Sequence, residues 1–363
     1  MYAQVICPAT DEFPRNSEGD IALLPDGRLL LAWTRFEGGE DDDRASIAGR
    51  YSTDMGRTWS APRLLHANDA RQNCMSASLL QLPEGDLLLL FLRKNSPTDL
   101  QVCVKRSGDM GATWGKPVQV TDGNGYYVMN NARVVRLASG RLIAPVARCE
   151  DASGPAEGSG HLRASCYYSD DGGLTWQPSE SWLDLSKRGA MEPGVVERSD
   201  GSLLMIIRTQ FGRIYKAVST DGGQTWDQLQ ITAELSPEAP ASIARVPATG
   251  HLVLVWNDNF DRGMPLGGLR APLRSAVSGD GGYHFMRYRT LEGDLSKGYA
   301  YASITFAGEE ALFTYYEGEM GGRLSLKFRA VPLSWFYEME DEHLRQSIYG
   351  RPEAAAAAAA ARL

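Results

Sequence analysis

The sequence lacks the features that would assign it to several common functional classes. Its five cysteines include no C-x-x-C pair, which argues against a disulfide framework or a zinc site and predicts buried free thiols. Its five histidines show no metal-ligand spacing, so no metal or other cofactor is predicted. Lys and Arg number 37 against 45 Asp and Glu, a net charge of -8. This balance predicts no binding to nucleic acid or to an anionic membrane surface.

Long apolar runs are also missing. No stretch reaches the length of a transmembrane helix, and residues 1–7 lack a basic region followed by an apolar core. We therefore expect a cytoplasmic protein, or a secreted or periplasmic one if a leader segment has been removed. The sequence does not indicate an oligomeric state.

Turns and repeats are abundant instead. The 38 glycines and 18 prolines are typical of an all-β protein. The pattern S-x-D-x-G-x-T-W occurs at residues 52–59, 107–114, 169–176 and 219–226, with a degenerate copy at 278–285. Asp can accept hydrogen bonds within such a turn, Gly tolerates positive φ, and Trp covers the turn. We interpret these carboxylates as turn-forming rather than catalytic.

A second repeat alternates with the first. Six segments combine an apolar run, a tight turn and another apolar run, at residues 21–32, 78–90, 134–143, 195–205, 243–255 and 304–315. Each predicts a hairpin of two buried strands, and their spacing fits four-stranded blades.

Six hairpins predict an all-β, six-bladed β-propeller forming a single domain over residues 1–350. The last blade would take its third strand from residues 324–331 and its fourth from residues 3–8, so that the ring closes. The Ala-rich tail 351–363 is predicted to be disordered or helical.

The two interleaved repeats resemble those of the sialidase (neuraminidase) superfamily over nearly the whole chain. The resemblance implies that Glu192 and Arg208 belong to the active site, with Arg270 as a further arginine and Arg274 as its alternative register. It implies a catalytic tyrosine at Tyr301, with Tyr299 as the competitor. It also implies an acid/base within residues 41–43, which we assign to Asp43.

One element departs from the family pattern. The superfamily begins its first inner strand with an arginine that binds the substrate carboxylate, whereas this chain has Ser17 and Glu18 there, and Arg15 is out of register. A carboxylate cannot replace a guanidinium in binding a carboxylate. Glu18 is therefore either a second catalytic carboxylate or a ligand for a sugar hydroxyl.

Innermost strands and their loops converge on the mouth of a propeller's central channel, where ligand sites are favoured. Seven further residues at such positions are predicted to bind substrate: Arg15, Asn16, Asp20, Asn130, Asn131, Arg133 and Tyr299. Together with Arg208 and Arg270, this set suits a polar sugar that carries an acidic group.

The sequence thus predicts a glycoside hydrolase of sialidase type that releases a terminal acidic sugar, either sialic acid or a related sugar acid. Its partner would be a carbohydrate substrate with an acidic group. One alternative is a glycosidase or polysaccharide lyase that acts on a uronic acid or another sugar. A second alternative is a propeller that binds glycans without catalysis.

Overall fold

The computed structural model describes residues 1–151, 160–319 and 321–340. These residues form an all-β structure with two short 3-10 helices, η1 (Pro265–Gly267) and η2 (Leu333–Tyr337). The predicted tail 351–363 lies outside the described residues, and the single-domain assignment stays a prediction. No helix in the described part of the chain has the length and apolar character needed to cross a membrane.

Three sheets have four strands each. The first contains β6 (Asn73–Gln81), β7 (Leu87–Ser96), β8 (Asp99–Ser107) and β9 (Val118–Gln119). The second contains β15 (Met191–Glu197), β16 (Leu203–Arg208), β17 (Arg213–Ser219) and β18 (Gln230–Leu235). The third contains β19 (Ser242–Arg245), β20 (Leu252–Asn257), β21 (Leu273–Ser278) and β22 (Met286–Glu292).

Two sheets are larger. A five-stranded sheet contains β10 (Tyr127–Val128), β11 (Val135–Arg136), β12 (Leu142–Cys149), β13 (Leu162–Ser169) and β14 (Gln177–Pro178). An eight-stranded sheet contains β1 (Tyr2–Cys7), β2 (Arg15–Leu23), β3 (Leu29–Phe36), β4 (Ala45–Ser52), β5 (Arg63–His66), β23 (Lys297–Ala307), β24 (Glu310–Glu319) and β25 (Leu324–Pro332). Its two halves meet at a single parallel register pair, Arg15 with Leu324.

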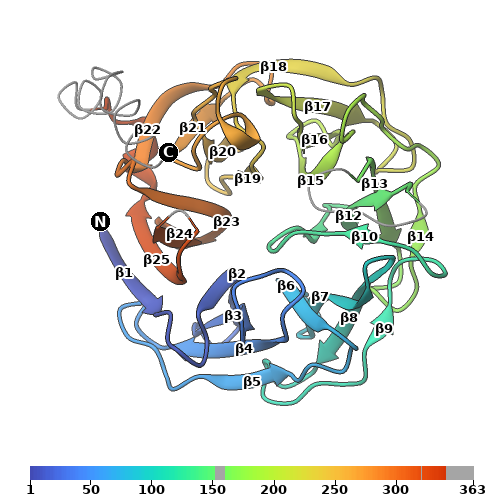
Figure 1. The fold of residues 1–363 in the computed structure, drawn as a ribbon, viewed down its shortest axis with the longest axis vertical. Coiled ribbons are helices and arrows are strands. Elements are labelled where there is room, and N and C mark those ends of the chain that lie inside the picture. The colour runs from blue at the N-terminus through green and yellow to red at the C-terminus, as the bar shows by residue number, and fades with distance from the viewer. Residues whose placement is uncertain (152–159, 320, 341–363) are drawn as a thin grey trace.

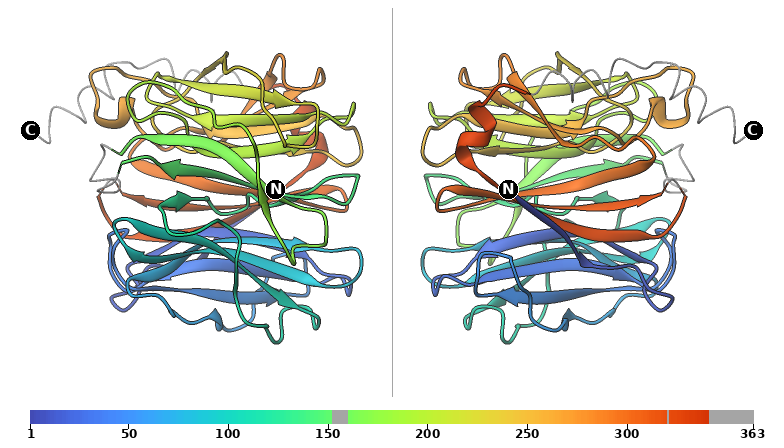
Figure 2. Two further views of the ribbon diagram at one scale, coloured as in Figure 1. Left: turned by 90° about the vertical axis from the view of Figure 1, so that its right-hand side faces the viewer. Right: turned by 90° about the vertical axis from the view of Figure 1, so that its left-hand side faces the viewer.

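The sheets are arranged like the blades of a propeller around a central opening (Figure 1). Strands β2, β6, β10, β15, β19 and β23 lie next to the opening, and β5, β9, β14, β18 and β22 lie at the periphery. The side views show that most strands run along the axis of this ring (Figure 2).

The predicted hairpins and ring closure are confirmed. The six paired segments form β2–β3, β6–β7, β11–β12, β15–β16, β19–β20 and β23–β24. Strand β1 pairs antiparallel with β25, with Tyr2 opposite Ala330. An N-terminal strand therefore covers what would otherwise be the free edge of β25.

The repeated turn has the internal bonding expected from its sequence. In the first copy, Asp54 Oδ1 accepts from the Thr58 amide at 2.8 Å, and the Ser52 hydroxyl donates to Asp54 at 2.8 Å. The Gly56 amide donates to Ser52 Oγ, and the Trp59 indole donates to the Gly56 carbonyl. The same carboxylate-to-amide contact recurs at Asp109, Asp171, Asp221 and Asp280.

Apolar side chains fill the space between neighbouring sheets. Leu88 and Leu90 of β7, for example, are buried in one cluster with Leu142 and Ala144 of β12. The prediction of buried free thiols is confirmed, because Cys7, Cys74, Cys103, Cys149 and Cys166 are all buried and unpaired. Because the faces of the sheets are covered by their neighbours, the innermost strands are the ones that line the central opening.

Candidate active site

Four innermost strands share a local irregularity. The regular register of β2, β6, β15 and β23 against their neighbours is broken by a β-bulge. At each bulge one non-glycine residue has positive φ: Glu18 at 56°, Ser76 at 61°, Glu192 at 44° and Tyr301 at 56°. Such a conformation costs about 1 kcal/mol or more for a residue with a Cβ, and bulges commonly re-aim a side chain.

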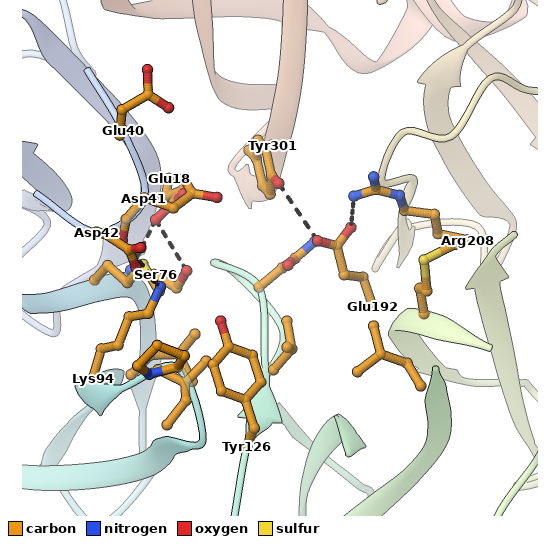
Figure 3. A pocket seen from close by; sticks show the side chains of 18 of the residues that line it. Glu18, Glu40, Asp41, Asp42, Ser76, Lys94, Tyr126, Glu192, Arg208 and Tyr301 are labelled. Atoms are coloured by element: carbon orange, nitrogen blue, oxygen red, sulfur yellow. Dashed lines mark hydrogen bonds and ion pairs between the residues drawn. The ribbon is translucent and has the colours of Figure 1, made fainter. Parts of the chain in front are cut away.

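These four residues line one pocket of about 570 Å³. Its wall also includes Glu40, Asp41, Asp42, Asp43, Lys94, Tyr126, Asn130, Arg188 and Arg208. The pocket has two chemically distinct sides (Figure 3): Tyr301, Glu192 and Arg208 form one side, and Glu18, Ser76, Asp41, Asp42 and Lys94 form the other. The repeated bulge therefore brings residues from distant parts of the sequence into one cavity.

On the first side, Tyr301, Glu192 and Arg208 form a connected row. The Tyr301 hydroxyl donates to Glu192 Oε1 at 3.5 Å, and Arg208 Nη1 donates to Glu192 Oε2 at 2.6 Å. Burial alone would raise the pKa of Glu192, but Arg208 outweighs it and the pKa lies below its ordinary value. Burial, reinforced by Glu192, raises the pKa of Tyr301. A neutral phenol thus lies beside an ionised carboxylate that is able to take its proton.

Arg270 lies next to the ring of Tyr301. Its guanidinium carbon is 5.6 Å from the centre of the Tyr301 ring, and its Nη1 donates to the Tyr316 hydroxyl at 2.8 Å. It forms no ion pair with any residue that the structure describes. An arginine without a carboxylate partner retains its capacity to bind an anionic ligand.

On the second side, both carboxylate oxygens of Glu18 accept hydrogen bonds from the protein. Its Oε2 accepts from the Thr34 hydroxyl and from both the amide and the hydroxyl of Ser76, at 3.0–3.1 Å. Its Oε1 pairs with Arg15 Nη2 at 3.0 Å. Burial raises the pKa of Glu18 in spite of Arg15. Glu18 therefore gives this side of the pocket an acceptor wall where the superfamily pattern has a cation.

Each carboxylate in the loop 41–43 has a different partner. Asp43 Oδ2 accepts from the Glu40 amide at 2.9 Å, and Asp42 pairs with Lys94 at 2.5 Å. Asp41 pairs with Arg15 at 2.5 Å. The Asp41 side chain is 72% exposed, but the pocket walls surround it at longer range. Those walls alone would raise the pKa of Asp41, yet Arg15, Lys94 and Arg270 together hold it below its ordinary value.

Five predicted substrate-binding residues lie away from this pocket. The Asn16 amide oxygen accepts from the Trp33 indole, and Asn131 donates to the carbonyls of Gly19 and Tyr301. Arg133 donates to Ser242 and to the Ala241 carbonyl. Asp20 accepts from the Ile21 and Leu79 amides and lines a different cavity, where burial raises its pKa to about 7. Tyr299 is 1% exposed and belongs to the apolar core beside Tyr315.

Sequence reasoning missed Ser76, Lys94, Tyr126 and Arg188. Lys94 had a usable signal, because it follows Arg93 directly after the apolar run of β7. The side chain of Arg93 donates instead to the Asp69 carbonyl, since successive residues of a strand point to opposite faces. Ser76 had the same position as Glu18 relative to the hairpin glycine. Arg188 lies in a loop, and nothing in the sequence pattern indicated it.

One group of possible metal ligands is assembled by the fold rather than by sequence spacing. His66, Asp69 and Cys74 place one ligand atom each within 4.8 Å of one another. Two protein cations already contact them, since Lys105 Nζ lies 3.3 Å from His66 Nδ1 and Arg93 Nε lies 3.3 Å from Asp69 Oδ1. Burial raises the pKa of the Cys74 thiol to about 12. A thiol that stays protonated and two adjacent cations do not fit a divalent metal.

The chain is similar to proteins of known family. Residues 23–314 match the family model described as BNR repeat-like domain. A sialidase from Bacteroides fragilis (strain YCH46) is 24% identical over 246 residues, covering 64% of this chain and 42% of that protein. A sialidase from Micromonospora viridifaciens is 26% identical over 280 residues, covering 64% of this chain and 41% of that protein. The chain thus spans less than half the length of these relatives.

A solved structure shows the same fold. The NanB sialidase from Streptococcus pneumoniae superposes with a TM-score of 0.72 at 16% identity, covering 91% of this chain and 70% of that chain. The match to the family model spans most of the chain, and both the relatives and this neighbour are sialidases. The chain belongs to the family of BNR repeat-like domains, within the sialidase superfamily.

Proposed function

We propose that this protein is a retaining exo-glycosidase that releases a terminal acidic sugar, sialic acid or a related sugar acid. The observation that carries the proposal is the row Tyr301–Glu192–Arg208, with a distance of 3.5 Å from the Tyr301 hydroxyl to Glu192. Arg270 lies beside this row without an ion pair to any described residue, and it adds a cation for the acidic group. The named function of the two relatives supports the same class of reaction.

The proposed reaction begins at Tyr301. Its hydroxyl oxygen attacks the anomeric carbon and its proton moves to Glu192 Oε1, while the bond to the leaving oxygen breaks and that oxygen takes a proton from a carboxylic acid. Water then attacks the same carbon and gives a proton to the carboxylate that protonated the leaving oxygen. The bond from this carbon to the Tyr301 oxygen breaks, and Glu192 returns its proton to that oxygen, so the sugar leaves with retained configuration. A neutral nucleophile avoids repulsion from an anionic sugar, which an attacking carboxylate would meet.

The acid/base remains within residues 41–43. The sequence assigns this role to Asp43, whose carboxylate accepts a hydrogen bond from the Glu40 amide of the same loop. Asp41 is the stronger candidate by position, because its charge acts on Tyr301 and on Arg15. Since Arg15 lowers the pKa of Asp41, the substrate must separate these two groups before Asp41 can donate a proton.

A second candidate is a glycosidase that acts on a uronic acid or another sugar. Glu18 favours it, because its Oε1 has one donor among the described residues and can also accept from a sugar hydroxyl, whereas it would repel a carboxylate. In this candidate Arg208 and Arg270 bind the acidic group from the opposite side, and the Tyr301–Glu192 pair keeps its role.

Activity on a fluorogenic sialoside and on a matched fluorogenic uronide tests the proposal. We expect Tyr301→Phe and Glu192→Gln each to lower kcat by about 10²-fold or more, as expected for a nucleophile and its base. Tyr299→Phe is the matched control, because that ring lies in the core, and it is expected to keep wild-type rates.

The outcomes separate the candidates. Cleavage of the uronide alone overturns sialic acid as the substrate and supports the second candidate. Binding of either sugar without cleavage, unaffected by Glu192→Gln, overturns catalysis and leaves a glycan-binding propeller. Melting temperatures of all variants show whether a lost rate reflects lost folding.

We also propose that the ring has six blades. The eight-stranded sheet would count as two blades of four strands, β2–β5 and β23–β25 with β1, because one register pair alone joins its halves. An experimental structure in which the blades are related by rotations of about 60° tests this count.

A further inference from the structure

A second cavity adjoins the candidate active site. It has a volume of about 600 Å³ and lies among the loop 210–212, the loop 260–267 and Lys187. Two aromatic rings form part of its wall, those of Phe211 and Phe260, and both are half-buried. Phe260 packs directly over Gly212 and Gly267, where a Cβ would meet its ring within 2.5 and 3.2 Å. Because these two glycines lack a side chain, the Phe260 ring has room to form one face of the cavity.

The exposed charges of the cavity are positive. Lys187 and Arg262 are both exposed, and neither side chain forms an ion pair with any described residue. Lys187 Nζ lies 4.9 Å from the centre of the Phe211 ring. The one acidic group of the wall, Glu238, is buried and is neutralised by Arg188 and Arg208. Among the described residues that line this cavity, an anion would meet two cations without an ion pair and no carboxylate without one.

The two cavities share a wall. Arg188 and Arg208 both line the first pocket and both bind Glu238, which lines the second. The Glu238 amide also donates to the Leu266 carbonyl at 2.6 Å, which ties the loop 260–267 to this wall. The second cavity therefore lies next to the first, on the other side of the ion pairs of Glu238 with Arg188 and Arg208.

We infer that this second cavity binds a further anionic sugar unit of the glycan whose terminal sugar occupies the first pocket. Phenyl rings suit the apolar face of a pyranose, and Lys187 and Arg262 suit its carboxylate or sulfate. The inference rests on the proposed function for the occupant of the first pocket. It adds that the protein selects glycans with at least two acidic units close together.

Binding measured separately at each cavity tests the inference. Methionine methyl groups labelled with ¹³C give one NMR signal per site: Met264 lines the second cavity, and Met191 lines the first. The experiment uses Tyr301→Phe to prevent turnover, with three probes: a disaccharide of two linked sialic acids, sulfated lactose, and lactose. We expect the disialyl probe to shift Met264 saturably, and lactose to bind there roughly tenfold more weakly or worse.

The charge variant is Lys187→Ala with Arg262→Ala, and Arg57→Ala with Lys116→Ala is the control of equal charge at exposed residues elsewhere. We expect the first pair to weaken the response of Met264 roughly tenfold and the control pair to leave it unchanged. Sulfated lactose equal to the disialyl probe at Met264 supports an anion site that accepts sulfate as well as carboxylate.

Three results would overturn the inference: Met264 unmoved while Met191 saturates, lactose binding as tightly as the disialyl probe, or equal effects of the two variant pairs. A wild-type protein that cleaves nothing, with Met264 still responding to the disialyl probe, sinks the proposed function and leaves this binding site intact.

Discussion

Arg15 contacts two carboxylates whose pKa values move in opposite directions. Glu18 is enclosed, and burial raises its pKa in spite of the ion pair. Asp41 keeps most of its side chain in solvent, and the attraction of Arg15 and its neighbours lowers its pKa. The same guanidinium therefore has opposite net results, because desolvation costs the enclosed carboxylate more than the ion pair returns.

Removing this guanidinium gives a prediction at the scale of one residue. In Arg15→Met, the pKa of Asp41 is expected to rise, because its strongest cationic neighbour is lost. The titration midpoint of Asp41, followed by ¹³C-carboxyl NMR and assigned with Asp41→Asn, measures the change. Arg15→Lys keeps the charge and should shift the midpoint less. An unchanged midpoint in Arg15→Met would refute the role given to this pair.

Individual contacts of this kind were not predictable from sequence. Arg15 and Asp41 are 26 residues apart, and Glu18 and Ser76 are 58 apart, so neither pair follows from local spacing. Asn131 and Arg133 stand beside site residues in the chain, yet they bind backbone and core groups. Which of several polar neighbours faces the cavity depends on bulges, which shift the alternation by one residue.

At the scale of elements, the repeated turn makes a prediction about acid stability. Each of these turn carboxylates accepts hydrogen bonds from the hydroxyl and the amide of a Thr and from the hydroxyl of a Ser. These bonds lower the pKa of Asp54, Asp109 and Asp171 to about 2. A carboxyl whose pKa is lower in the folded state stabilises that state above its ordinary pKa of 3.8 and loses this contribution as pH falls through 2. The turns therefore help the fold most near neutral pH.

The triple variant Asp54→Asn, Asp109→Asn and Asp171→Asn is expected to melt at a lower temperature than wild type at pH 7. The gap to wild type should narrow as the pH falls from 4 to 2, because wild type then loses the same contribution. Melting temperatures at pH 7, 4 and 2.5 measure this. The control with Gln at Glu12, Glu84 and Glu309 removes three exposed charges and should not lower stability at pH 7. A gap that stays constant with pH would contradict the assignment.

For the whole molecule, ring closure by β1 is the feature to test. Strand β1 pairs with β25 through five register pairs, and Ile6 and Cys7 are 4% and 3% exposed. Deleting residues 1–7 removes these bonds and two buried side chains and exposes the edge of β25. We expect a loss of roughly 3 kcal/mol or more in unfolding free energy, and self-association through the free edge.

Denaturant unfolding and size-exclusion chromatography measure both effects of that deletion. Deletion of Met1 alone, which is 78% exposed, serves as the control. If the longer deletion stays monodisperse and unfolds at the same denaturant concentration as wild type, β1 does not close the ring.

The architecture was far more predictable than the chemistry. The propeller-like arrangement, the hairpins and the N-terminal closure all follow from signals repeated along the chain, such as the turn at residues 169–176. Packing then has few alternatives, because every repeat buries the same faces. Each site residue occurs only once in the sequence. A wrong register at such a residue therefore cannot be detected by comparison with other repeats. Glu192 and Tyr301 followed from the family resemblance, whereas Arg188 did not.

The bulges on β2, β6, β15 and β23 allow the side chains of the site to change without a change in the fold. Each bulge presents one side chain to the central cavity, while the rest of the strand keeps its ladder and its apolar contacts. A mutation at such a position can alter specificity while the strand pairing and the apolar core stay the same. Glu18, at the position where the superfamily resemblance implies an arginine, is the position at which we expect such a difference in specificity.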